Sequence, residues 1–181
     1  EEEIITTLEA HIASFADKLQ VTTDGVVAQM RHWYDGFCFS AECQHVYNPF
    51  SVLLLFKQQR FANYWFESGT PTFLIKLLKE RNYDVALLDR LEVNELSFSS
   101  YEIEDLQVLP LLFQSGYLTI KGYNPTRRLY RLGYPNLEVE QAFTQVLLGS
   151  FSSVDGTLTD SYLWRLIDAL HEEDLELFFE V

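Results

Sequence analysis

The sequence predicts a mainly α, α+β protein in which a helical subdomain is followed by a winged-helix-like module with one β-hairpin. Three observations support this prediction. Apolar residues recur every three or four positions through most of the first half, as in helices with one buried face. Alternating apolar and polar residues, typical of strands, are confined to the second half, where they flank a turn signal. With 48% apolar and 15% aromatic residues, the 181 residues can bury a sizeable core.

The first two helices are predicted from apolar spacing and from capping residues. Residues 2–19 carry an apolar stripe, and Thr23 or Asp24 can cap a second helix. Asp35-Gly36 marks the end of that second helix, because Asp-Gly is a strong turn signal. The aromatic residues in 37–47 then predict a short hairpin or an ordered loop.

Two further helices are predicted to start at a capping residue followed by proline. In Asn48-Pro49, Asn accepts a hydrogen bond from a free N–H, and Pro at the first helical position needs none. Thr70-Pro71 repeats this signal before an apolar stripe over 73–78. Large aromatic residues are ordinary core material, so we expect burial of the following side chains in this half. They are Trp33, Phe50, Trp65 and Phe73.

The second half begins with a predicted strand and a predicted helix. Residues 91–98 alternate apolar and polar side chains. Ser99 and Glu102 have the spacing of a capping box for a helix running toward Phe113, and Gly116 suits the position just after its end.

A β-hairpin is predicted next. Residues 117–123 and 129–134 alternate like strands around an Asn-Pro-Thr turn. Helix, glycine stop and hairpin in this order outline a winged helix. Asn136 then caps a further helix, and after a Ser/Gly loop a last apolar stripe covers residues 163–170.

We expect three regions and a longer parent protein. Residues 1–85 form the helical subdomain, 86–150 the winged-helix-like module, and 151–181 a C-terminal helical segment. The chain begins at Glu1 without Met and stops at Val181 without a helix-ending signal, so we expect a segment of a longer protein.

The net charge of -14 and a pI near 4.5 repel phosphate backbones and argue against a dedicated nucleic-acid binder. No apolar run approaches the ~20 residues needed to cross a bilayer, so we expect a cytoplasmic protein without membrane contact. His32, Cys38, Cys43 and His45 superficially resemble a zinc site, but their spacing fits no usual closed site, and we predict no metal.

No catalytic motif is present in the sequence. A P-loop, a G-x-S-x-G elbow, an H-E-x-x-H helix and a G-x-G-x-x-G loop are all missing. Two acidic clusters, near residues 102–105 and 172–174, fall in or near the first turns of predicted helices, where negative charge is favourable. We therefore predict no catalytic residue and no cofactor within this chain.

The predicted hairpin is the most basic part of the sequence. The cations are Lys121, Arg127, Arg128 and Arg131. They either pair with nearby carboxylates, such as those of the following helix, or contact phosphate in DNA or in a nucleotide held elsewhere.

Five ordered motifs over about residues 1–143 resemble the bacterial AAA-ATPase-like family. The motifs are Trp33-Tyr34-Asp35-Gly36-Phe37, Val46-Tyr47-Asn48-Pro49-Phe50-Ser51-Val52, Tyr64-Trp65-Phe66-Glu67-Ser68-Gly69-Thr70-Pro71, Gly116-Tyr117-Leu118-Thr119-Ile120 and Tyr130-Arg131-Leu132-Gly133-Tyr134-Pro135-Asn136. Read from the residues themselves, Asp35-Gly36 makes a turn and Asn48-Pro49 starts a helix, so their role is interpreted as structural.

The resemblance implies partners in the same parent chain. A P-loop ATPase core, with ATP and magnesium, would precede these motifs, and a PD-(D/E)XK nuclease-like domain often follows them. The favoured hypothesis is a non-catalytic regulatory module that packs on the nucleotide-binding core and couples it to an effector domain. The alternative is a winged-helix module that binds DNA weakly through the basic hairpin. A third hypothesis, an independent hydrolase, has no residue constellation to support it.

Overall fold

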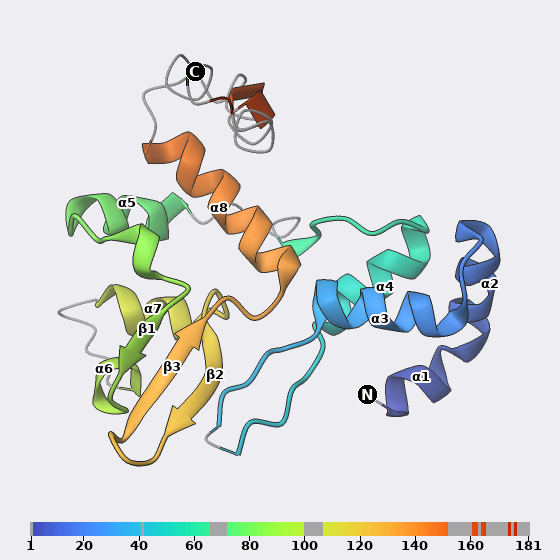
Figure 1. The fold of residues 1–181 in the computed structure, drawn as a ribbon, viewed down its shortest axis with the longest axis horizontal. Helices are drawn as coiled ribbons and strands as arrows, with labels where there is room; N and C mark the ends of the chain where they lie inside the picture. The colour runs from blue at the N-terminus through green and yellow to red at the C-terminus, as the bar shows by residue number, and fades with distance from the viewer. Residues whose placement is uncertain are drawn as a thin grey trace. The chain divides into compact units, whose positions relative to one another are not determined.

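The computed structural model describes residues 2–40, 42–65, 72–99 and 107–151, together with 161, 162, 164, 165, 174 and 176. It divides into two compact units, Glu1–Ala142 and Phe143–Val181. The first unit holds most of the described residues and is considered by itself below. Its helices and small antiparallel sheet confirm the predicted mainly α, α+β class (Figure 1). The three predicted regions, with boundaries at 85 and 150, stay a prediction.

Four helices begin the first unit. They are α1 (Glu2–Thr7), α2 (Glu9–Leu19), α3 (Thr23–Tyr34) and α4 (Pro49–Gln58). The predicted single helix over 2–19 is interrupted at Leu8, although Leu8 still bonds Ile4 and Ile12. The cap of α3 is Thr22, whose hydroxyl accepts from Gly25 N–H, instead of Thr23 or Asp24.

These helices enclose the larger core of the first unit. Its fully buried side chains include Phe15, Met30, Tyr34 and Leu55, and Tyr64 from the segment after α4 joins them. Trp33 and Trp65 are only half-buried. The expected burial of Phe50 and Phe73 is wrong, since they are 49% and 58% exposed.

The reason for these exposed rings is helical phase. In α4 the buried positions are Ser51, Val52, Leu55 and Phe56, which share one face, and Phe50 lies off that face. In α5 (Thr72–Glu80) the same holds for Phe73, because Leu74, Ile75, Leu77 and Leu78 form the buried side. The apolar residues therefore predicted these helices, but tertiary packing determined which face of each helix is buried.

The second half of the first unit has the element order of a winged helix. After α5 come a 3₁₀ turn (Val85–Leu87), β1 (Leu91–Val93), α6 (Leu96–Ser99), α7 (Val108–Gln114), β2 (Thr119–Asn124) and β3 (Leu129–Gly133). The sheet order is β1-β3-β2, with both pairings antiparallel (Figure 1). The strand predicted over residues 91–98 is longer than the observed strand β1. It stops at Val93, and Asn94 accepts from Ser97 N–H to start α6.

The predicted hairpin is confirmed as β2 and β3, with a bulge between Ile120 and Gly122. Gly116 adopts a φ of 79° after α7, and Tyr117 N–H returns to Leu112 O at 2.9 Å. This is the left-handed helix ending that glycine favours. Asn136 caps α8 (Leu137–Phe151), as predicted, by accepting from Val139 N–H at 3.1 Å.

The loop between α3 and α4 joins both parts of the first unit. Phe37 and Val46 form an isolated antiparallel bridge, which agrees with the ordered loop expected there. The Cys38 carbonyl accepts from Ile120 N–H at 3.0 Å, and Cys38 packs with Phe113 and Leu132 in a second, smaller core. The loop thereby fastens the helical part to β2.

Several expectations concern residues outside the described ones. They are Glu102, the capping-box partner expected for Ser99, which is itself the last residue of α6, together with the helix start at Thr70-Pro71, the loop after Phe151 and most of the stripe over 163–170. Among the described helices, none is long and apolar enough to cross a membrane.

Candidate functional site

The first and last motifs of the sequence meet in the first unit. Gly36 has a φ of 107°, and a Cβ at this position would collide with the carbonyl oxygen of Pro135. Lys121 closes the same junction, because its Nζ donates to Pro135 O at 2.8 Å. The Asp35-Gly36 turn, strand β2 and the start of α8 are thus held against one another.

A buried carboxylate joins two more motifs to the start of α8. Glu138 is fully buried, and both its oxygens accept from Ser51 Oγ at 2.9 Å. Oε1 also accepts from Tyr64 N–H at 2.7 Å, and Trp65 N–H is a further donor to the carboxylate. Burial raises the pKa of the Glu138 carboxyl to about 7, against the opposing effect of these hydrogen bonds.

Asn48 has two roles beside this carboxylate. Its Oδ1 accepts from Phe50 N–H at 3.1 Å, which caps α4 as predicted, and Pro49 takes the first helical position. Its Nδ2 donates to Ser51 Oγ at 2.8 Å. Asn48 therefore orients the hydroxyl that serves Glu138, a role that the helix-start signal alone does not reveal.

Aromatic side chains fill the space around these contacts. Tyr34 OH bonds both the carbonyl and the N–H of Ala62 at 3.1 Å, and burial raises its pKa. Trp65 stacks on Phe37 with ring centres 5.3 Å apart and meets Tyr117 edge-on. A Cβ at Gly116 would lie 3.1 Å from the Trp65 ring, so this glycine allows the close approach. Trp33 packs against Tyr34 at the rim of the larger core.

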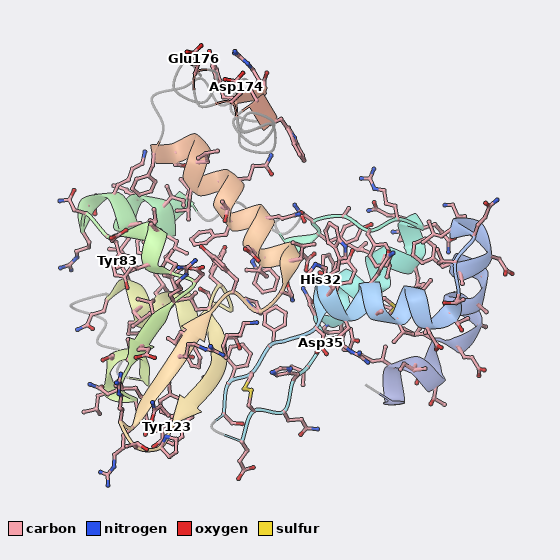
Figure 2. The ribbon with its side chains drawn as sticks, in the orientation of Figure 1. His32, Asp35, Tyr83, Tyr123, Asp174 and Glu176 are labelled. Carbon is pink, nitrogen blue, oxygen red and sulfur yellow. A yellow bond between two sulfur atoms is a disulfide. The ribbon has the colours of Figure 1, made fainter. Side chains whose placement is uncertain are left out.

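A pocket of about 340 Å³ lies beside the start of α8. Its charged and imidazole lining comes from the end of α3, the following loop, β2 and α8. These side chains are Arg31, His32, Asp35, His45, Lys121 and Glu140. Figure 2 labels His32 and Asp35 where α3 ends. Desolvation lowers the pKa of Lys121, with Glu140 and Asp35 opposing the shift and Arg131 adding to it.

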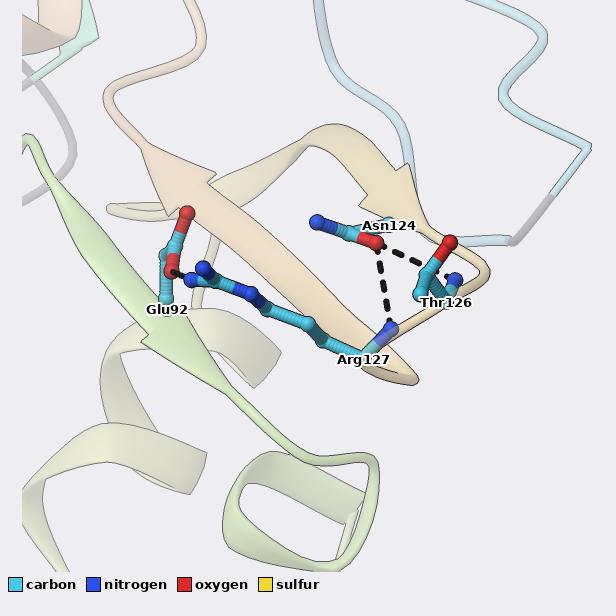
Figure 3. Close-up of polar contacts among 4 residues, drawn as sticks. All are labelled: Glu92, Asn124, Thr126 and Arg127. Atoms are coloured by element: carbon cyan, nitrogen blue, oxygen red, sulfur yellow. Dashed lines mark hydrogen bonds and ion pairs between the residues drawn. The ribbon is translucent and has the colours of Figure 1, made fainter.

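The hairpin cations have different partners. Arg127 pairs with Glu92 of β1 at 3.9 Å (Figure 3), and Arg131 Nη2 donates to Lys121 O at 3.3 Å. Arg128 is an exposed turn residue with a φ of 54°. The expected carboxylate partners on the following helix are thus replaced, for Arg127, by one on β1. Asn124 Oδ1 shapes the turn by accepting from Thr126 N–H and Arg127 N–H at 3.1 Å.

The two cysteines of the chain are bonded to each other. Cys38 and Cys43 form a disulfide across the loop that follows α3. In the described ranges, no group of three His, Cys, Asp or Glu side chains is placed to hold a metal ion. His45 and His32 both line the pocket beside α8, which their spacing in sequence did not indicate.

Glu138 and Ser51 were missed at the level of sequence. A Glu in the first turn of a helix is ordinary, because it favours the helix dipole, and such residues are usually exposed. The only available signal was that Ser51 and Glu138 each follow an Asn cap closely. The disulfide was also missed, since two cysteines alone suggested no framework.

Comparison with known proteins adds one relative. The chain is 43% identical over 125 residues to an uncharacterized protein in the vnfD 5' region of Azotobacter chroococcum mcd 1. That match covers 66% of this chain and 23% of the relative, so the chain spans under a quarter of the longer protein. No family model matches the chain. No solved structure matches it either. The chain is therefore similar to an uncharacterised bacterial protein.

Proposed function

We propose that this chain is a non-catalytic regulatory module of a larger cytoplasmic AAA-ATPase-like protein. It packs on a nucleotide-binding core of the same protein and couples that core to a downstream effector domain. ATP and magnesium belong to the core in this proposal, and the module itself performs no chemistry. The five motifs that resemble the family motivate the proposal, and one structural observation carries it.

That observation is a set of exposed apolar side chains before and after Pro49 in the chain, here called the apolar surface: Phe39 and Val46 in the loop before α4, and Phe50 and Leu53 in α4. These side chains are 52%, 50%, 49% and 62% exposed. Two pockets of about 280 Å³ each share Pro49, one lined also by Phe39 and Val46 and the other lined also by Leu53. Exposed apolar side chains gathered in this way are typical of an interface.

The surface is also connected to the motif junction. Pro49 and Phe50 follow Asn48, which holds Ser51, and Ser51 in turn holds the buried Glu138 of α8. A partner bound to α4 would therefore contact residues next to a chain of hydrogen bonds that runs from Asn48 through Ser51 to Glu138 at the start of α8. This supports coupling, because hydrogen-bonded networks and packed elements carry energy between sites.

The test uses the full-length parent protein. Phe50→Ser with Leu53→Ser should change its ATP turnover several-fold, because the module would no longer seat on the core. Leu87→Ser with Leu96→Ser is the matched control, since Leu87 and Leu96 are also exposed, at 52% and 76%, and lie outside this surface. A parent that binds no nucleotide, or equal effects of both pairs, would overturn the proposal.

A companion measurement concerns the chain alone. Because the glycine-rich phosphate cradle of a P-loop is missing, titration with ATP and magnesium in a calorimeter should show neither micromolar affinity nor turnover. Micromolar binding would mean that a nucleotide site lies in this chain, which would contradict the proposed non-catalytic role.

The alternative function, DNA binding, is favoured by the winged-helix order of elements and by the exposed Arg127 and Arg128 at the hairpin tip. A winged helix would be expected to present α7 to the major groove, as helix-turn-helix proteins do. In α7, however, the sequence Val-Leu-Pro-Leu-Leu-Phe-Gln offers no cation, and Val108, Leu112 and Phe113 are buried. DNA contact would therefore rest on the hairpin alone.

A further inference from the structure

The pocket beside α8 is rich in hydrogen-bond donors. The guanidinium of Arg31, the ammonium of Lys121 and the imidazoles of His32 and His45 come from three different parts of the fold. Each of these groups can donate to an oxyanion, and Arg and Lys do so with charge assistance. Such a gathering is unusual in a chain with a net charge of -14.

The first turn of α8 adds backbone donors to this pocket. Leu137, the first residue of the 15-residue helix, lines the pocket. The first N–H groups of a helix have no partner within it, and the helix dipole makes this end attractive to anions. In α8 the third N–H, of Val139, is already capped by Asn136.

Asn136 adds an independent observation that points to an anion in this pocket. The residue is 8% exposed and lines the pocket, and its Nδ2 has no hydrogen-bond partner in the part of the chain that the structure describes. Its Oδ1 is committed to Val139 N–H, so the amide cannot be reversed without losing the cap. A buried donor without an acceptor is costly, and an oxyanion seated at the helix start would satisfy it.

Two acids share the lining and limit the anion that fits. Asp35 Oδ1 accepts from Gly36 N–H at 2.8 Å, so one carboxylate oxygen is already engaged by the backbone. Glu140 lies one turn into α8 and acts electrostatically on Lys121. Both acids disfavour a long polyanion, whereas a single phosphate at the helix start keeps its contacts with the donors.

We propose that this pocket binds the phosphate group of a small phosphate monoester, with the phosphate at the first turn of α8. The volume of about 340 Å³ exceeds what one phosphate needs and falls at the lower end of small-molecule sites. Helix starts flanked by Arg and Lys are established phosphate sites in proteins. This proposal goes beyond the regulatory function and does not depend on a nucleotide-binding core.

The test is an NMR titration of the 181-residue chain with glycerol 3-phosphate, inorganic phosphate and glycerol at matched ionic strength. Both phosphates should cause saturable shifts of the Leu137 N–H and the Asn136 side-chain amide, with affinities on the order of millimolar. Tighter binding of glycerol 3-phosphate assigns the monoester, and equal affinities assign free phosphate as the source. Shifts with glycerol alone, or no saturable shift with either phosphate, would overturn the proposal.

Variants separate a built site from general attraction to cations. Arg31→Gln should weaken phosphate binding about tenfold, because a charge-assisted donor is lost. Asn136→Ser should weaken binding without loss of stability, since Ser can still cap α8 while the unpartnered donor disappears. Arg127→Gln is the control, because it removes an exposed cation outside the pocket. An equal loss of affinity in this control would overturn the proposal.

Discussion

The carboxylate of Glu138 accepts a 2.9 Å hydrogen bond from the hydroxyl of Ser51, which lies 87 residues earlier in the chain. This contact, together with the 2.7 Å bond from Tyr64 N–H, ties α4, the segment after it and α8 to a single buried side chain. Within the first unit, Glu138 therefore connects α8 to α4 and to the segment after α4.

Glu138 should make stability depend on pH. Its pKa is raised by burial from 4.5 to about 7, so the folded state holds the proton more tightly than the unfolded chain does. The stabilisation is full below pH 4.5 and is lost as the pH rises through 7, by at most about 3 kcal/mol. Glu138→Gln, measured by urea unfolding from pH 5 to 8, should flatten this decline.

The control for this prediction is Glu140→Gln, two residues further along α8 at an exposed position. It should leave the decline with pH as in the parent chain. Equal slopes for the parent and Glu138→Gln would show that Glu138 does not titrate in this range.

Gly36 should not tolerate a side chain. Alanine at this position would have to keep a φ of 107° and would meet the Pro135 carbonyl, which is backbone and cannot rotate away. Gly36→Ala should therefore lower the free energy of unfolding by about 2–3 kcal/mol.

Gly122→Ala is the matched control for Gly36→Ala in chemical denaturation. A Cβ at Gly122 would lie 3.8 Å from the flexible end of Arg131, which is ordinary contact. If Gly36→Ala proved as mild as this control, the junction between Asp35-Gly36 and Pro135 would not be formed in solution.

Phe15 and Phe50 should differ sharply in their contribution to stability. Phe15 is fully buried in the larger core, whereas Phe50 is 49% exposed. Phe15→Ala should cost about 3–5 kcal/mol because it leaves a cavity, and Phe50→Ala should cost less than about 1 kcal/mol. Thermal unfolding of both variants tests this difference, and a large loss for Phe50→Ala would mean that the chain covers this ring itself.

The hairpin arginines test the DNA alternative. If Arg127 and Arg128 contact phosphate, replacing both with Ala should weaken DNA binding of the parent protein at low salt and flatten its salt dependence, because fewer counterions are released. Fluorescence anisotropy with a short duplex measures both effects. Lys57→Ala with Lys76→Ala is the control, since these exposed cations lie on α4 and α5.

The expected outcome is weak binding with little sequence preference, given the net charge of -14 and the pairing of Arg127 with Glu92. Superimposable titrations of the double variant and the parent would exclude the hairpin as a DNA contact. In that case Arg127 acts only in its exposed ion pair, which contributes less than about 1 kcal/mol.

Local signals in the sequence determined where several elements begin and end. Asn48 and Asn136 cap helices, Gly116 ends α7, and the Asn-Pro-Thr turn separates β2 from β3, as predicted. Each of these features depends on the conformational preferences of a few contiguous residues, so no distant partner is needed to form it. Helix periodicity also located the helical first half.

Tertiary structure alone decided which side chains those elements bury and what they contact. From sequence, Glu138 is an ordinary acid in a first helical turn, but in the fold it is buried and accepts hydrogen bonds from Ser51 and Tyr64. From sequence, Phe50 is expected in the core, but α4 buries a different face. The same holds for Arg127, whose partner Glu92 lies on a strand that joins the sheet only through β3. Burial and pairing depend on contacts between residues far apart in the chain, and the conformational preferences of neighbouring residues do not determine those contacts.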